Sequence, residues 1–81
     1  MKNALLKRIE VNPRVMIGKP VIRGTRIPVE IILEKLAADL SIEEILEDYP
    51  RLTRQDVLAA FAYARGVVGT EEIVPQVRLS R

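Results

Sequence analysis

The stretch of sequence that decides the fold of this chain reads Gly18-Lys19-Pro20-Val21-Ile22-Arg23-Gly24-Thr25-Arg26-Ile27-Pro28. Gly24 lies between two short apolar runs and can adopt the positive φ that a tight chain reversal often requires. Pro28 suits the first position of a helix, because the N–H that proline lacks would have no partner there. The stretch therefore predicts two very short extended segments around a turn, followed directly by a helix.

The first predicted helix begins at Pro28 and ends near Leu40. Its apolar residues recur at the spacing of one helix face; they are Val29, Ile32, Leu33, Leu36, Ala37 and Leu40. A second, short helix follows Ser41, since Ser41 and Glu44 have the spacing of a capping box. Pro50 ends this helix, because a proline disfavours the α conformation at the residue before it.

The third predicted helix is capped by Thr53, with Asp56 in the place of the longer Glu of a capping box. Its body is rich in alanine, which favours a slim helix that neighbouring elements can approach closely. Gly66 is typical of the residue that follows a helix, so we expect the helix to end there. A short helix, a tight connection and a longer helix form the plan of a helix-turn-helix.

The two ends of the chain are less regular. Leu6 to Val11 alternates apolar and charged residues and predicts a short strand, which Asn12-Pro13 ends. Residues 70–81 have no clear helical period and are interpreted either as a disordered terminus or as a strand that binds a partner. The sequence thus predicts one domain over residues 1–69 and a tail over 70–81. The fold class is mostly α, a three-helix bundle preceded by short N-terminal β-strands.

The composition excludes several classes of function. The chain has 81 residues, the length of one small domain, and contains neither cysteine nor histidine. Disulfides, thiolate metal sites and the usual general base near neutral pH are therefore absent, and no Ser or Thr has a credible base beside it. We expect no enzymatic activity, no cofactor, no bound metal and no small-molecule substrate. No apolar run approaches the ~18 residues of a membrane span, so a cytoplasmic protein is expected.

Charge is distributed unevenly along the chain. Residues 1–28 hold seven cations and the single acid Glu10, whereas residues 30–48 hold seven acids and the single cation Lys35. One interpretation is a solvated surface with uneven charge. The other is an N-terminal face that binds a polyanion.

Two groups of residues are candidates for DNA binding. At the start of the third helix, Arg51, Thr53, Arg54 and Gln55 have side chains that bond phosphates or base edges. In the preceding loop the candidates are the cations Lys19, Arg23 and Arg26, placed like the minor-groove arm of a homeodomain. The alternative for Arg23 and Arg26 is an ion pair with Glu30 or Glu34 that only fixes the turn.

Apolar residues exceed what one small core can bury, which indicates a homodimer or another partner. The candidates for dimerisation are Ile9, Val11, Val67 and Val68. In the tail, Pro75 prevents a long helix and limits a strand to the edge of a sheet. The tail residues that we expect to contact a protein partner are Ile73, Val74, Val77 and Leu79.

Three segments together resemble the domain-of-unknown-function family 433. They are Asn12-Pro13, the stretch from Gly18 to Val29, and Ser41 to Pro50, and the resemblance covers roughly Ile9 to Arg65. It implies a homeodomain-like three-helix fold preceded by short strands. It also implies an antitoxin that neutralises a PIN-like ribonuclease toxin and represses its own promoter by binding that DNA. The tail lies outside the resemblance, and its contact with the toxin is expected from its own residues. The alternative is a non-enzymatic protein-interaction module that does not bind DNA.

Overall fold

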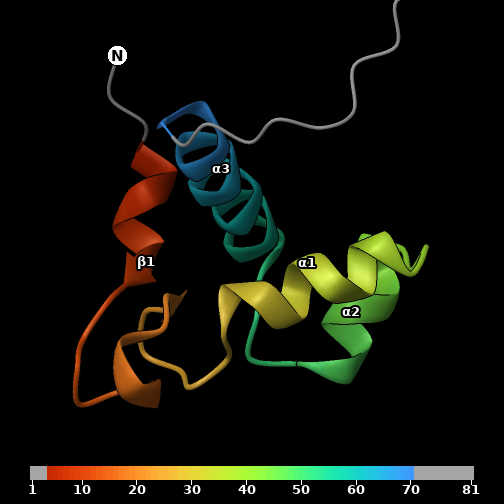
Figure 1. The fold of residues 1–81 in the computed structure, drawn as a ribbon. Helices are drawn as coiled ribbons and strands as arrows, with labels where there is room; N and C mark the ends of the chain where they lie inside the picture. Colours follow the sequence, from red (N-terminus) through yellow and green to blue (C-terminus); the bar gives the residue numbers. More distant parts are fainter. Residues whose placement is uncertain (1–3, 71–81) are drawn as a thin grey trace, which may run out of the picture.

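The computed structural model describes residues 4–70, which form three α-helices and a small two-stranded sheet (Figure 1). The order along the chain is the 3-10 helix η1 (Ala4–Arg8), the strand β1 (Ile9–Glu10), the 3-10 turn η2 (Met16–Gly18), the strand β2 (Val21–Ile22), and the helices α1 (Val29–Ala37), α2 (Ile42–Asp48) and α3 (Arg54–Thr70). η1 lies along α3, and α1 and α2 pack together beside the start of α3. The mostly helical fold class, with short strands before the helices, is confirmed.

The sheet is an antiparallel pair in which Ile9 lies opposite Ile22 and Glu10 opposite Val21. The predicted turn follows β2 directly. Gly24 has φ of +81°, and the Thr25 N–H and hydroxyl both donate to the Ile22 carbonyl, at 3.0 and 2.7 Å. The Ile22 N–H in turn donates to the Ile27 carbonyl at 3.0 Å, which closes the turn. The positive φ that the sequence required of Gly24 is thus present.

The predicted strand from Leu6 to Val11 is wrong over most of its length, because only Ile9 and Glu10 are extended and Ala4–Arg8 form η1. The physical reason is the partner strand. Pro20 cannot donate to a ladder and Gly24 begins the reversal, so β2 offers only two residues for pairing. The preceding residues pack on α3 as a short helix instead.

The first helix is shorter than the sequence predicted at both ends. Pro28 is extended and precedes α1, and the helix ends at Ala37 where Asp39 takes a left-handed conformation with φ of +72°. The Leu40 N–H reaches back to the Lys35 carbonyl at 3.1 Å, which is the long-range bond of a Schellman motif. Leu40 still packs against the core, so the apolar pattern extends three residues past Ala37, where the helix ends.

Both predicted helix caps before α2 and α3 are present. The Glu44 N–H donates to Ser41 Oγ at 3.0 Å, and the Ser41 N–H donates to Glu44 Oε1 at 2.7 Å. At α3, the Asp56 N–H donates to Thr53 Oγ1 at 3.2 Å and the Thr53 N–H donates to Asp56 Oδ2 at 2.9 Å. The shorter Asp therefore completes a capping box as Glu does elsewhere.

The predicted end of the third helix at Gly66 is wrong, because α3 continues to Thr70. Glycine weakens a helix by about 1 kcal/mol relative to alanine but does not forbid it. Tyr63, three residues before Gly66, is partly buried against the core. Residues 71–81, which include most of the predicted tail, lie outside the described part of the chain.

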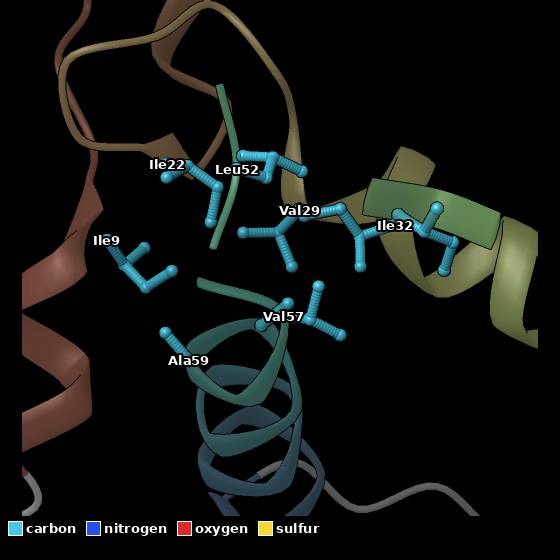
Figure 2. Packing of buried hydrophobic residues seen from close by; sticks show 9 residues of the cluster. Ile9, Ile22, Val29, Ile32, Leu52, Val57 and Ala59 are labelled. Carbon is cyan, nitrogen blue, oxygen red and sulfur yellow. The ribbon is translucent and has the colours of Figure 1, made fainter. Parts of the chain in front are cut away.

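The core joins the sheet to all three helices. Figure 2 shows Ile9, Ile22 and Val29 meeting Leu52 and Val57, with Ile32 on the side of α1 and α2. Because the buried strand residues pack on the start of α3, the turn at Gly24 is held in a fixed place beside that helix.

An ion pair between the exposed Arg8 and the buried Asp56 adds a polar connection between distant segments. Asp56 is 7% exposed, and its Oδ1 accepts a hydrogen bond from Arg8 Nη1 at 3.1 Å. The same carboxylate caps α3 through Oδ2, so both of its oxygens are used. One side chain therefore fixes the start of α3 and the end of η1.

Replacing Ile32, which is fully buried, with alanine should lower the free energy of unfolding by about 2–5 kcal/mol, because the cavity would be left among packed helices. Urea denaturation followed by far-UV circular dichroism measures this. Val11→Ala is the control, since Val11 is 57% exposed and its truncation should change stability by about 0.5 kcal/mol or less. Equal effects of the two changes would contradict the described core.

Asp56→Ala should lower the free energy of unfolding by about 1–3 kcal/mol, because it removes a helix cap and leaves Arg8 without its carboxylate partner. Thermal denaturation is a suitable measurement. Asp48→Ala serves for comparison, since Asp48 pairs with Lys35 at 3.7 Å on the surface and such pairs contribute at most about 1 kcal/mol. A larger loss from Asp48→Ala would refute this assignment.

Candidate nucleic-acid interface

The predicted cationic loop lies against the residues that precede α3. Arg51 Nη2 donates to the Gly24 carbonyl at 3.2 Å, which joins the turn to the connection between α2 and α3. Arg26 and Arg51 are exposed and line one hollow of about 430 Å³, together with Glu10, Val15, Gly24 and Thr25. Neither arginine forms an ion pair with another residue in the range 4–70. Two uncompensated guanidinium groups at a concave surface are suited to binding phosphate.

A second hollow continues this surface toward η1. Arg23 Nε donates to the Lys7 carbonyl at 2.7 Å, so the turn is also tied to η1. Lys7, Arg8 and Arg23 line this hollow of about 350 Å³ with Ala4 and Asp56. We define the basic face as Lys7, Arg8, Arg23, Arg26 and Arg51.

Sequence reasoning missed Lys7 and Arg8 as members of this face. They were counted among the N-terminal cations, but the strand expected over Leu6–Val11 gave no reason to place them beside α3. The available signal was the cluster Lys7-Arg8 in front of the first buried residue, Ile9. Its position became clear only through the contact of Arg8 with Asp56, 48 residues away.

The first turn of α3 presents the helix candidates at the border of the basic face. Thr53, Arg54 and Gln55 are all exposed. The Thr53 hydroxyl is engaged in capping, and Arg54 Nη1 lies 3.9 Å from Glu43 Oε2 in a well-solvated pair that holds it weakly. Gln55 is next to Asp56, which belongs to the hollow with Arg8 and Arg23. The structure thus brings the loop candidates Arg23 and Arg26 and the helix candidates to one end of α3.

Lys19 does not join this group. Its Nζ lies 2.8 Å from Glu30 Oε2 at the beginning of α1, and it borders a different, mainly apolar groove. The predicted alternative, an ion pair of Arg23 or Arg26 with Glu30 or Glu34, does not occur within residues 4–70, where Glu30 pairs with Lys19. Arg23 is bonded to backbone carbonyls instead.

The apolar groove lies between α1 and the second half of α3. Its volume is about 290 Å³, and its apolar lining includes Pro20, Leu33, Tyr63, Val67 and Val68. Val68 is 59% exposed there, whereas Val11 is exposed on the loop after β1. Ile9 belongs to the hydrophobic core and pairs with β2, so it is not available on the surface as Val68 is. The tail candidates Ile73, Val74, Val77 and Leu79 lie outside the described residues.

Two further properties of residues 4–70 bear on the site. None of the helices described there is both long and apolar enough to cross a membrane. No three acidic, histidine or cysteine side chains in this range are grouped so that they could hold a metal ion.

Comparison with known proteins identifies relatives of this arrangement. A crystal structure of a DUF433 member protein from Anabaena variabilis superposes with a TM-score of 0.70 and 36% sequence identity, covering 73% of this chain and 58% of that one. An uncharacterized protein named y4eO from Sinorhizobium fredii is 40% identical over 53 residues, which is 65% of this chain. An uncharacterized protein of Archaeoglobus fulgidus is 60% identical over 25 residues, 31% of this chain and 69% of its own length.

The share of each relative that the chain covers and the residues that match the family are informative in different ways. The chain spans only 24% of the length of the Sinorhizobium protein. The family described as "Protein of unknown function (DUF433)" matches residues 9–64, from the first core residue through most of α3. Both strands, the turn at Gly24, α1, α2 and the first part of α3 fall within that range. On this match, together with the structural likeness to a family member, the chain belongs to the DUF433 family.

Proposed function

We propose that this protein binds DNA through the basic face and the first turn of α3, and that it acts as an antitoxin-like repressor of its own promoter. The observation that carries the proposal is the hydrogen bond from Arg51 to the Gly24 carbonyl. It places an otherwise uncompensated cationic turn at the N-terminal end of the helix that follows the tight connection. That helix has the position of the recognition helix in a helix-turn-helix.

The chemistry of the face suits the DNA backbone. Arg26 and Arg51 are exposed and have no carboxylate partner within residues 4–70, so a phosphate would not have to displace one. Arg23 is partly committed to the carbonyls of Lys7 and Ile9, which orients it rather than neutralises it. Phosphate contacts of this kind position a protein on the duplex without selecting a sequence.

Sequence selection would come from the first turn of α3. Gln55 pairs well with adenine and Arg54 with guanine in the major groove. Arg54 would have to leave Glu43, which costs little because both side chains are exposed. The alanines and the buried residues further along α3 leave few polar groups to read bases, so we expect a short recognition sequence for each protomer.

A second surface supports the antitoxin part of the proposal. The apolar groove between α1 and α3 is a surface of the kind that a protein partner covers. We propose that Val67 and Val68 contribute there to a homodimer, and that residues 73–79 of the tail bind a PIN-like ribonuclease toxin. The same groove is what favours the alternative function, a protein-interaction module without DNA binding.

Arg51→Ala should weaken binding to a DNA duplex from the chain's own upstream promoter. The slope of log K against log salt concentration should become shallower by about 0.9, which is the contribution of one phosphate contact in B-DNA. Fluorescence anisotropy over a series of salt concentrations measures both. Arg65→Ala is the matched control, because it removes the same charge from the exposed, distant half of α3.

Two results would contradict the proposal. One is the absence of any binding by the unaltered protein at low salt and micromolar concentration. The other is an equal loss from Arg65→Ala, which would indicate general charge attraction rather than a defined face. A thermal denaturation of Arg51→Ala is needed beside these titrations, since Arg51 also bonds the Gly24 carbonyl.

Val68→Glu should convert a dimer to a monomer, because a charge in a desolvated interface is costly. Analytical ultracentrifugation at micromolar concentration is the measurement. Leu6→Glu provides the comparison, since Leu6 is also an exposed apolar residue and does not line the groove. Ile9 is unsuitable for this test because a charge there would disrupt the protomer's own core. A monomer in the unaltered protein would exclude the homodimer.

A further inference from the structure

The loop between the two strands contains three successive left-handed residues. Met16 and Ile17 have φ of +53° and +57°, and Gly18 has φ of +80°. Glycine adopts this conformation readily, but it is unfavourable for L-residues and most unusual for a β-branched one. Ile17 is therefore held in a conformation that its own side chain disfavours.

Hydrogen bonds keep this loop in place. The Gly18 N–H donates to the Val15 carbonyl and the Lys19 N–H to the Met16 carbonyl, both at 3.1 Å. At the start of the loop, Asn12 accepts the Arg14 N–H on its side chain at 2.9 Å and the Val15 N–H on its carbonyl at 2.8 Å. The loop is thus built to present residue 17 in one orientation.

The side chain gains nothing from the described part of the protein in return. Ile17 is 94% exposed, more than any other exposed large apolar residue of residues 4–70. Strain that persists at a fixed, exposed position is a common property of functional sites. The observation calls for a binding partner that covers the side chain.

The surroundings of Ile17 are mainly cationic. No acidic residue lies between Glu10 and Glu30 in the sequence. Val15, two residues before Ile17, lines the same hollow as Arg26, Arg51 and the single acid Glu10, so the loop is continuous with the basic face. Arg14 on the same loop is exposed and forms no ion pair with any residue from 4 to 70.

We propose that Ile17 is an apolar wedge that enters the minor groove of a DNA duplex bound on the basic face and kinks it at one base step. This inference rests on the proposed DNA binding. Proteins that bend DNA insert side chains such as isoleucine between base pairs, with arginine or lysine on the adjacent phosphates, and produce kinks of roughly 20–90°. Here Arg14 and Arg26 would supply those flanking contacts.

A duplex fits these features better than the two other surfaces that cover apolar side chains. An apolar pocket on a protein would not account for Arg14, Arg26 and Arg51, which have no carboxylate partner within residues 4–70 and outnumber the one acid of the adjoining hollow, Glu10. A lipid bilayer attracts such cations, but stable attachment requires the apolar face of a whole helix or an acyl chain, and one isoleucine provides far less area. The charge complementarity therefore favours DNA.

The experiment uses the full-length protein and duplexes of the promoter segment that it binds best. One set of duplexes carries a fluorescent donor and acceptor at the two ends, which report bending. The other carries 2-aminopurine at successive positions, whose fluorescence rises when that base is unstacked. We expect the unaltered protein to shorten the end-to-end distance and to unstack one step.

Two substitutions of Ile17 distinguish loss of the wedge from a change in the stability of the fold. Ile17→Gly should bind without bending or unstacking, and should not lower the thermal midpoint, because glycine suits the left-handed backbone. Ile17→Met should keep both signals, since methionine also serves as a wedge.

The possible failures are distinguishable. If Ile17→Gly bends and unstacks the duplex as the unaltered protein does, the wedge is wrong while DNA binding stands. If the unaltered protein binds no duplex, both proposals are wrong. Ile17→Gly could also bend DNA normally but lose a co-purifying ribonuclease, which would assign the loop to a protein partner. If it bends DNA normally but loses binding to anionic vesicles, the loop contacts a membrane. Either result would overturn the wedge.

Discussion

The carboxylate of Asp56 is the interaction on which the arrangement of this small domain depends. It accepts the Thr53 N–H at the start of α3 and the Arg8 guanidinium at the end of η1. The two contacts join segments that are 48 residues apart in sequence. A carboxylate that is almost fully buried requires such partners, because an unpaired charge in that place would be strongly unfavourable. The position of the N-terminal segment on α3 thus follows from a local requirement of one helix cap.

The rest of the basic face is assembled around that junction. η1 places the Lys7 carbonyl where Arg23 bonds it, and β1 pairs with β2 so that the turn at Gly24 follows immediately. Arg51 then closes the arrangement from the other side by bonding the Gly24 carbonyl. Arg23 and Arg51 are oriented by backbone carbonyls, which leave their charges uncompensated, whereas Arg8 is paired with Asp56. An oriented and uncompensated guanidinium group is suited to binding an anion.

Local signals in the sequence predicted most of the fold. The capping boxes at Ser41 and Thr53, the stop before Pro50 and the turn at Gly24 depend on residues within a few positions of each other, so they could be read without knowing the tertiary structure. The wrong predictions have different causes. Residues 6–8 are helical because β2 is too short to pair with them, whereas α3 continues past Gly66 because one glycine weakens a helix without ending it. The site was predicted only in part. Arg23, Arg26 and Arg51 stood out by composition, whereas Arg8 joined them only through Asp56, and Lys19 was removed by Glu30.

The pair between Arg54 and Glu43 marks the line where the surface changes sign. On one side are the cations of the turn and η1, and on the other are the acids of α2, which include Glu43, Glu44, Glu47 and Asp48. The formal net charge of the chain is only +2, so attraction to a polyanion at long range is weak. The separation of charge nevertheless gives the domain a dipole moment. An approaching anionic polymer would exert a torque that turns α2 away and the basic face forward, so the orientation of the encounter is set before any contact forms.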